Sequence, residues 1–153
     1  GIHLIFGLGD TEREFTQTID WVYAHHGKVG LFALTPVRGA QTSLQPPDLA
    51  AWRRMQIFRY LRSLKMLEYK SCRFENDCLS RVPLAADEYE RCLADGEAFR
   101  TAGCPDCNRP YYNERPGGIL YNFPRQLASD EVRQCLAEAG GLTDACNGER
   151  NCP

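Results

Sequence analysis

Several features that would assign a protein to a broad functional class are missing from this sequence. No apolar run approaches the length of a membrane-spanning helix, and no segment has the pattern of a secretory signal peptide. There is also no P-loop and no nucleophile elbow. Basic residues are not in excess, since 18 Lys and Arg stand against 20 Asp and Glu and the formal net charge is −2. We therefore expect neither nucleic acid nor a membrane as a partner.

Cysteine is absent from the first 71 residues. A disulfide framework would leave this half without a crosslink, although its apolar pattern is that of a self-sufficient core. The sequence therefore favours reduced cysteines that serve a metal site, and we expect a cytoplasmic protein. The eight cysteines of the second half are Cys72, Cys78, Cys92, Cys104, Cys107, Cys135, Cys146 and Cys152.

The first half of the chain alternates between strand and helix patterns. Two near-continuous apolar runs, Gly1–Leu8 and Val29–Leu34, are typical of strands that are buried on both faces. A capping-box sequence at Thr11–Glu14 opens a helix after the first strand. A longer helix is predicted over Pro46–Lys65. This order predicts an α/β fold with a parallel sheet.

The second half is predicted to be less regular. We divide the chain into residues 1–70 as the α/β part, 71–140 as a Cys-rich extension, and 141–153 as a mobile tail. Within the extension and the residues just before it, the patterns predict short strands at Met66–Lys70 and Ile119–Phe123, a polar loop at Ser71–Arg81, and helices at Ala85–Arg100 and Ser129–Ala139 with Ser129 as the N-cap.

The most informative segment is Gly103–Pro116. Its Cys104 and Cys107 form a Cys-x-x-Cys pair, a spacing that lets two thiolates point at one metal centre. The surrounding residues are too rich in proline, tyrosine and polar side chains for an ordinary core element, which indicates an ordered functional loop. Four thiolates are the usual shell of an iron–sulfur cluster. Cys72 and Cys78 are the most plausible completion, because both fall in a polar loop.

The remaining cysteines allow simpler interpretations. Cys92 and Cys135 fall on apolar helix faces, where a free cysteine packs as a small hydrophobic residue. Cys146 and Cys152 lie in the tail, where a late metal ligand, a disulfide and exposed thiols all stay open.

Two other functional classes use the same cysteines. A structural zinc ion on Cys72, Cys78, Cys104 and Cys107 would make the chain a non-enzymatic interaction module. A redox dithiol at Cys104 and Cys107 would instead require the motif at a helix N-terminus, whereas here it follows a predicted helix and enters a proline-rich loop.

Four segments carry a resemblance to a known superfamily. His3–Asp10 is similar to the GxIxGxxE strand motif of radical S-adenosylmethionine enzymes, and Thr11–Phe15 resembles the turn and helix start that follow it. Leu34–Gly39 resembles the end of the next barrel strand. Ala102–Glu114 resembles the C-terminal region of biotin-synthase-like enzymes, including the two-component lipoyl synthases. The resemblance covers roughly residues 1–140.

The resemblance implies a partial TIM-type (β/α) barrel, formed by its C-terminal strands and helices, with a Cys-rich extension. The chain departs from the family pattern at His3, where the motif has Gly, and at Asp10, where it has Glu. The CxxxCxxC triad that holds the S-adenosylmethionine-cleaving cluster is absent, and the chain begins at Gly1 inside an apolar run. We therefore expect the C-terminal half of an enzyme, inactive without the N-terminal barrel half or a partner subunit.

The resemblance also implies a reaction and its cofactors. In this family S-adenosylmethionine yields a 5′-deoxyadenosyl radical, and an auxiliary 4Fe-4S cluster supplies sulfur to an unactivated carbon, in some members on a lipoyl-carrier-type protein. The implied cluster ligands are Cys72, Cys78, Cys104 and Cys107. The implied contacts to the substrate or around the cluster come from Arg109, Tyr111, Tyr112, Asn113 and Arg115.

The barrel mouth of such enzymes lies at the carboxyl ends of the strands. The residues implied there for S-adenosylmethionine are Ile5, Gly7, Gly9, Asp10, Thr35 and Arg38. Small residues at Gly7 and Gly9 would let a ligand approach the backbone closely, and Asp10 could accept a hydrogen bond. On the residues alone, the simpler interpretation is favoured, in which Gly7 and Gly9 only shape a strand-to-helix turn and Asp10 is a helix cap, because a short Gly-x-Gly is a weak signal.

Overall fold

The computed structural model describes residues 1–36, 39, 42–102 and 118–143 of the 153. In chain order the elements are β1 (Ile2–Phe6), α1 (Glu12–Ala24), β2 (Val29–Ala33), α2 (Leu49–Ser63), the 3-10 helix η1 (Tyr69–Ser71), β3 (Arg73–Glu75), β4 (Cys78–Arg81), α3 (Ala86–Leu93), the 3-10 helix η2 (Glu97–Phe99) and α4 (Ser129–Ala139).

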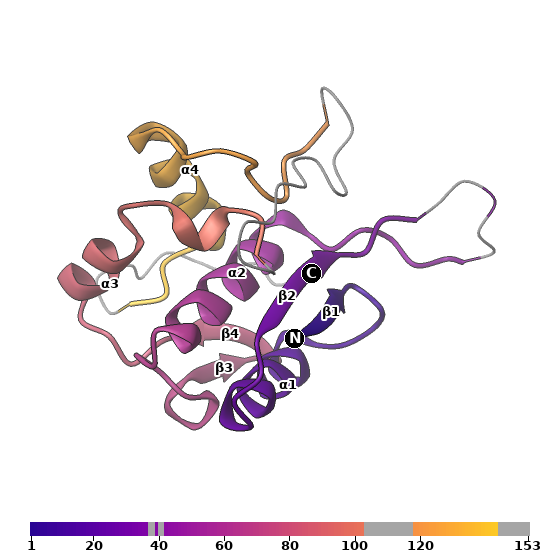
Figure 1. Cartoon of the computed structure of the whole chain (residues 1–153), viewed down its shortest axis with the longest axis horizontal. Helices are drawn as coiled ribbons and strands as arrows, with labels where there is room; N and C mark the ends of the chain where they lie inside the picture. The colour runs from indigo at the N-terminus through magenta and orange to yellow at the C-terminus, as the bar shows by residue number, and fades with distance from the viewer. Residues whose placement is uncertain (37–38, 40–41, 103–117, 144–153) are drawn as a thin grey trace.

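The predicted α/β class is confirmed in the first half. Strands β1 and β2 pair in parallel, with Ile2 opposite Val29 and Phe6 opposite Ala33, and α1 connects them. Figure 1 shows α2 near the centre of the molecule, with β1, β2 and α1 on one side and α3 and α4 on the other. The described strands form two separate two-stranded sheets, so this part of the chain contains no closed barrel.

Local capping explains where the first two helices begin. The Thr11 hydroxyl accepts from the Glu14 N–H at 3.2 Å, and the Glu14 carboxylate accepts from the Thr11 N–H at 2.9 Å, which is the predicted capping box. The Asp48 carboxylate accepts from the N–H groups of Ala50 and Ala51, so α2 starts after Asp48 and not at the predicted Pro46.

A single core surrounds α2. Trp52, Ile57 and Phe58 of this helix are fully buried. They share one hydrophobic cluster with Ile19 of α1 and with Leu93 and other residues of the second half, so both halves contribute to the same core. Cys135 lies within the cluster and Cys92 packs against its edge, as their apolar positions predicted.

The prediction that β1 is buried on both faces is wrong for the described structure. Only Phe6 is buried, whereas Ile2 is 41 % and Ile5 44 % exposed. The reason is that β2 is the only described strand that pairs with β1. The other edge of β1 therefore pairs with no described strand.

Two predictions around residue 70 are also wrong. The predicted loop Ser71–Arg81 contains the antiparallel hairpin β3–β4, whose turn residues Asn76 and Asp77 have positive φ angles of 48° and 63°. Asn and Asp tolerate this conformation better than other side chains, which makes the short turn possible. The predicted strand Met66–Lys70 instead leads into η1, because the Ser71 hydroxyl bonds the Glu68 carbonyl at 2.7 Å and closes a tight turn.

The remaining corrections concern the second half. The helix predicted over Ala85–Arg100 ends at Leu93, because the left-handed Gly96 (φ 73°) interrupts it before η2. The segment predicted as the strand Ile119–Phe123 makes only an isolated bridge, between Phe123 and Arg100.

Helix α4 is confirmed, but its N-cap is Ala128 rather than Ser129, because the Glu131 carboxylate accepts from the Ala128 N–H. The described start of the predicted tail is packed, since Leu142 is fully buried. None of the helices in the described ranges is both long and apolar enough to span a membrane.

Candidate functional site

A pocket of about 410 Å³ opens at the carboxyl end of β1. Its walls come from the turn between β1 and α1, from the residues before and at the start of α2, and from the turn of the β3–β4 hairpin. This volume falls within the range of about 300–1,000 Å³ that is usual for small-molecule sites. The carboxyl ends of parallel strands are also where open α/β sheets bind ligands.

The two glycines of the β1–α1 turn have different roles in this pocket. Both have φ angles that favour glycine, 107° at Gly7 and 113° at Gly9. A Cβ at Gly7 would lie only 3.1 Å from the Pro47 ring and 3.1 Å from Leu34 Cβ, so Gly7 is required for packing. A Cβ at Gly9 would meet no atom within 4 Å. Gly9 therefore shapes the turn and leaves its backbone open to the pocket.

Carboxylates line the pocket, and most of them are already engaged. Asp48 caps α2, and Asp77 bonds the Arg13 guanidinium at 2.7 Å. Asp10 is exposed and makes no hydrogen bond or ion pair within the described part of the chain. Among the described residues that line the pocket, none is Lys, Arg or His. The arrangement suits a ligand that carries a positive charge or several hydrogen-bond donors, with Asp10 as the free acceptor.

The floor of the pocket is fixed by a buried ion pair. Glu12 and Arg54 are each only 5 % exposed, and the Arg54 Nε lies 2.9 Å from a Glu12 carboxylate oxygen. The same carboxylate accepts from the Leu79 N–H at 2.9 Å, and Arg54 also donates to the Ala139 carbonyl. Glu12 thus holds the starts of α1 and β4 against α2 and is not available to a ligand.

The structure gathers half of the residues that the resemblance implies for S-adenosylmethionine. Gly7, Gly9 and Asp10 line the pocket. Ile5 is half exposed on β1, and the Thr35 hydroxyl approaches the Ala33 carbonyl at 3.5 Å; neither lines the pocket. Arg38 lies outside the described residues.

The structure does not bring Cys72 and Cys78 to one centre. The hairpin pairs Glu75 with Cys78 and Arg73 with Arg81, so Cys72 and Cys78 lie at opposite ends of it. At about 3.3 Å per residue they are about 10 Å apart along the strands. Within the described residues, no group of three or more His, Cys, Asp or Glu could hold a metal ion.

Neither Cys72 nor Cys78 presents a thiolate that could bind a metal ion. Burial, followed by the charge of Asp20, raises the pKa of the Cys72 thiol to about 12. Cys78 lines the pocket but is disulfide-bonded, so the prediction of reduced cysteines is wrong for Cys78. Cys72, Cys92 and Cys135 are free thiols. Reduction would be needed before Cys78 could bind a metal.

The rest of the predicted cluster site lies outside the described residues. These positions are Cys104, Cys107, Arg109, Tyr111, Tyr112, Asn113 and Arg115, together with Cys146 and Cys152.

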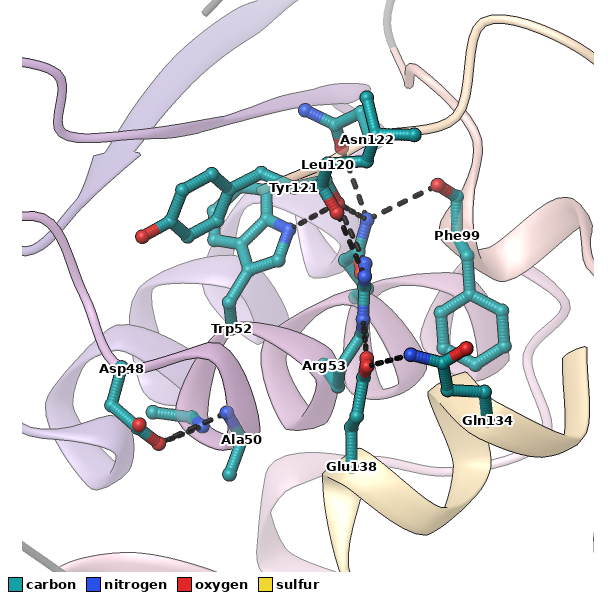
Figure 2. Close-up of polar contacts among 12 residues, drawn as sticks. Asp48, Ala50, Trp52, Arg53, Phe99, Leu120, Tyr121, Asn122, Gln134 and Glu138 are labelled. Carbon is teal, nitrogen blue, oxygen red and sulfur yellow. Dashed lines mark hydrogen bonds and ion pairs between the residues drawn. The ribbon is translucent and has the colours of Figure 1, made fainter. Parts of the chain in front are cut away.

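The two chain segments that flank residues 103–117 lie side by side. The Thr101 N–H donates to the Phe123 carbonyl at 3.2 Å, and the Phe123 N–H donates to the Phe99 carbonyl at 3.0 Å. Helix α2 holds the second flank, because Arg53 donates to the carbonyls of Leu120 and Tyr121 at 2.8 and 2.7 Å (Figure 2).

Two features were not predicted from the sequence: the buried polar cluster formed by Arg53, Gln56 and their partners, and the pocket walls at Pro47 and Asn76. Arg53 is 2 % and Gln56 1 % exposed, and the Arg53 guanidinium is also bound by Glu138 at 2.9 Å. The available signal was the placing of Arg53 and Gln56 among the apolar positions of the helix pattern. The pocket walls at Pro47 and Asn76 had no comparable signal, because they depend on how distant segments pack.

Comparison with protein-family models, curated proteins and solved structures gave no match to this chain.

Proposed function

We propose that this chain is part of a radical S-adenosylmethionine enzyme and that the pocket beyond β1 holds the nucleoside part of that cofactor. The observation that carries the proposal is the place of the pocket. It forms where the segment His3–Asp10 ends, at the carboxyl edge of two parallel strands. Sulfur insertion into an unactivated carbon is the reaction class that the likeness of Ala102–Glu114 to biotin and lipoyl synthases suggests.

The arrangement of the first half is compatible with part of a barrel. The order β1-α1-β2-α2 with parallel pairing repeats the unit of a (β/α) barrel. The exposed Ile2 and Ile5 support the idea that further strands belong beside β1, because barrel strands are buried on both faces. The N-terminal barrel half or a partner subunit would supply them.

The described pocket residues fit S-adenosylmethionine, which carries a sulfonium, an ammonium and ribose hydroxyls. Asp10 would accept hydrogen bonds from its donors, and the open backbone at Gly9 would let the ligand approach closely. The carboxylates around the pocket, with no described cation among them, would favour its positive charge. When bound and reduced, this cofactor supplies the radical that begins the reaction.

The described cysteines do not fit an auxiliary cluster. Cys72 is a partly buried thiol with a raised pKa, and it lies apart from the disulfide-bonded Cys78. An auxiliary 4Fe-4S cluster would therefore depend on Cys104 and Cys107 with further ligands, and we assign it no step. The cofactor-cleaving cluster would come from the partner, because the sequence has no CxxxCxxC motif.

Equilibrium dialysis with S-adenosylmethionine tests the pocket. Asp10→Asn keeps the size of the side chain but removes its charge, and we expect about tenfold weaker binding, the usual effect of one charged hydrogen bond. Asp87→Asn is the matched control, since Asp87 is exposed in the first turn of α3 and outside the pocket. No saturable binding by the wild type, or equal binding by Asp10→Asn, would contradict the proposal.

Metal analysis of the anaerobically purified chain separates the cluster from the zinc alternative. We expect iron and sulfide with a broad visible absorption in the wild type, and their loss in the double variant Cys104→Ala/Cys107→Ala. Cys92→Ala/Cys135→Ala is the control, because both sulfurs belong to the hydrophobic packing. Zinc without sulfide would instead favour a structural interaction module.

A further inference from the structure

We infer that Tyr121 is a positioning residue for the pocket beyond β1, and that its hydroxyl couples the packing of residues 118–123 to ligand binding. Tyr121 lies 74 positions after Pro47, and its hydroxyl donates to the Pro47 carbonyl at 2.9 Å. Tyr121 does not line the pocket, whereas Pro47 does. The inference rests on the proposed function only for the identity of the ligand.

Pro47 transmits this contact to the β1–α1 turn. Its Cδ would lie 3.1 Å from a Cβ built at Gly7, so the proline ring and the glycine backbone form one continuous wall. The next residue, Asp48, lines the same pocket and caps α2 through Ala50 and Ala51. A shift of the Pro47 carbonyl would therefore move both the wall and the helix cap.

The segment before α2 has few other constraints. Pro46 and Pro47 have no N–H to donate. Within the described residues, the other hydrogen bonds of Thr42–Pro47 are local: the Leu44 N–H bonds the Thr42 hydroxyl, and Gln45 bonds the Ser43 carbonyl. The Tyr121 hydroxyl thus ties this exposed segment to a distant and rigid part of the molecule.

Tyr121 is itself held firmly by α2. Its carbonyl accepts from Trp52 Nε1 at 2.7 Å, from Arg53 at 2.7 Å and from Gln56 at 3.0 Å (Figure 2). Its ring meets the Trp52 ring edge to face, with the centroids 5.8 Å apart. Tyr121→Phe keeps the backbone bonds and the ring, and so removes a single hydrogen bond without unfolding the segment.

Two measurements on Tyr121→Phe test the inference. Hydrogen exchange without ligand is expected to be about fivefold faster at the amides of Ala50 and Ala51, which donate to the Asp48 carboxylate, and S-adenosylmethionine binding about fivefold weaker, the effect of one neutral hydrogen bond. Tyr60→Phe is the matched control. It removes a hydroxyl that bonds Asp95 at 3.3 Å near the other end of α2, and neither readout should change.

The outcomes separate this inference from the proposed function. Unchanged exchange in Tyr121→Phe overturns the positioning role. Faster exchange with undiminished binding overturns the coupling to the ligand. Faster exchange in Tyr121→Phe, in a protein whose wild type binds no S-adenosylmethionine, supports the positioning of the wall and contradicts the proposed function.

Discussion

At the residue scale, the buried carboxylate of Glu12 shows how one side chain can define a site without touching a ligand. It receives hydrogen bonds from Arg54 and from the backbone of Leu79, two residues far away in the sequence. A charge removed from water is tolerated only when its partners are in place. The ion pair between Glu12 and Arg54 therefore fixes the geometry of the pocket beyond β1 by holding its walls in place.

Glu12→Gln should destabilise the protein strongly. It leaves the Arg54 guanidinium buried without its counter-charge, and breaking such a pair costs about 3 kcal/mol or more. Urea denaturation followed by circular dichroism measures the change. Glu90→Gln is the control, because this exposed residue on α3 should alter the free energy of unfolding by less than about 0.5 kcal/mol. Equal midpoints for the two variants would mean that the pair is not buried in solution.

At the element scale, the predictions that succeeded are those with local causes. The capping box at Thr11 predicted the start of α1 from neighbouring residues. Helices α2 and α4 were likewise found close to their predicted bounds. The segment 119–123 was predicted as a short strand, and its composition is largely apolar. Its carbonyls are instead bound by Trp52, Arg53 and Gln56, about 70 positions away, which no local pattern can reveal.

The residues of the candidate site also divide into those that a local segment predicts and those that depend on distant contacts. Gly7, Gly9 and Asp10 were identified from one short segment and do line a pocket. The pairing of Cys72 with Cys78 was inferred from a loop that is in fact a hairpin, and its register separates them. The opposite wall, formed by Pro47, could not be predicted in this way. It depends on a contact with Tyr121, 74 positions later in the sequence, which forms only in the folded chain.

The first turn of α4 gives a pH prediction. The Arg125 guanidinium, followed by the Ala128 N–H, lowers the pKa of Glu131 to about 2. Because the folded state favours the charged form, the stabilisation is complete above the ordinary pKa near 4.5 and is lost as the pH falls toward 2. An NMR titration should show a Glu131 midpoint near 2, moved upward in Arg125→Gln. A wild-type midpoint near 4.5 would show that this contact does not persist.

At the scale of the whole molecule, the open edge of β1 is the least protected feature of the fold. The Ile2 N–H bonds Lys28 and the Phe6 carbonyl bonds Leu34, so residues 2, 4 and 6 direct their backbone groups toward β2. In a parallel strand the alternate residues, His3 and Ile5, direct theirs to the opposite edge. The strand contains no Lys, Glu, Asp or Pro, the residues that normally prevent edge pairing.

We therefore predict that the isolated chain self-associates, and that a co-expressed N-terminal barrel half suppresses this by covering the edge. Ile5→Lys should also shift the chain toward monomer, because a charge at an open edge opposes pairing. Leu64→Lys is the control: Leu64 is similarly exposed at 48 %, but it lies at the end of α2. Sedimentation velocity over an approximately hundredfold concentration range measures the association. A wild-type monomer throughout would mean that β1 needs no further strand, and it would count against a role for this chain as part of a larger barrel.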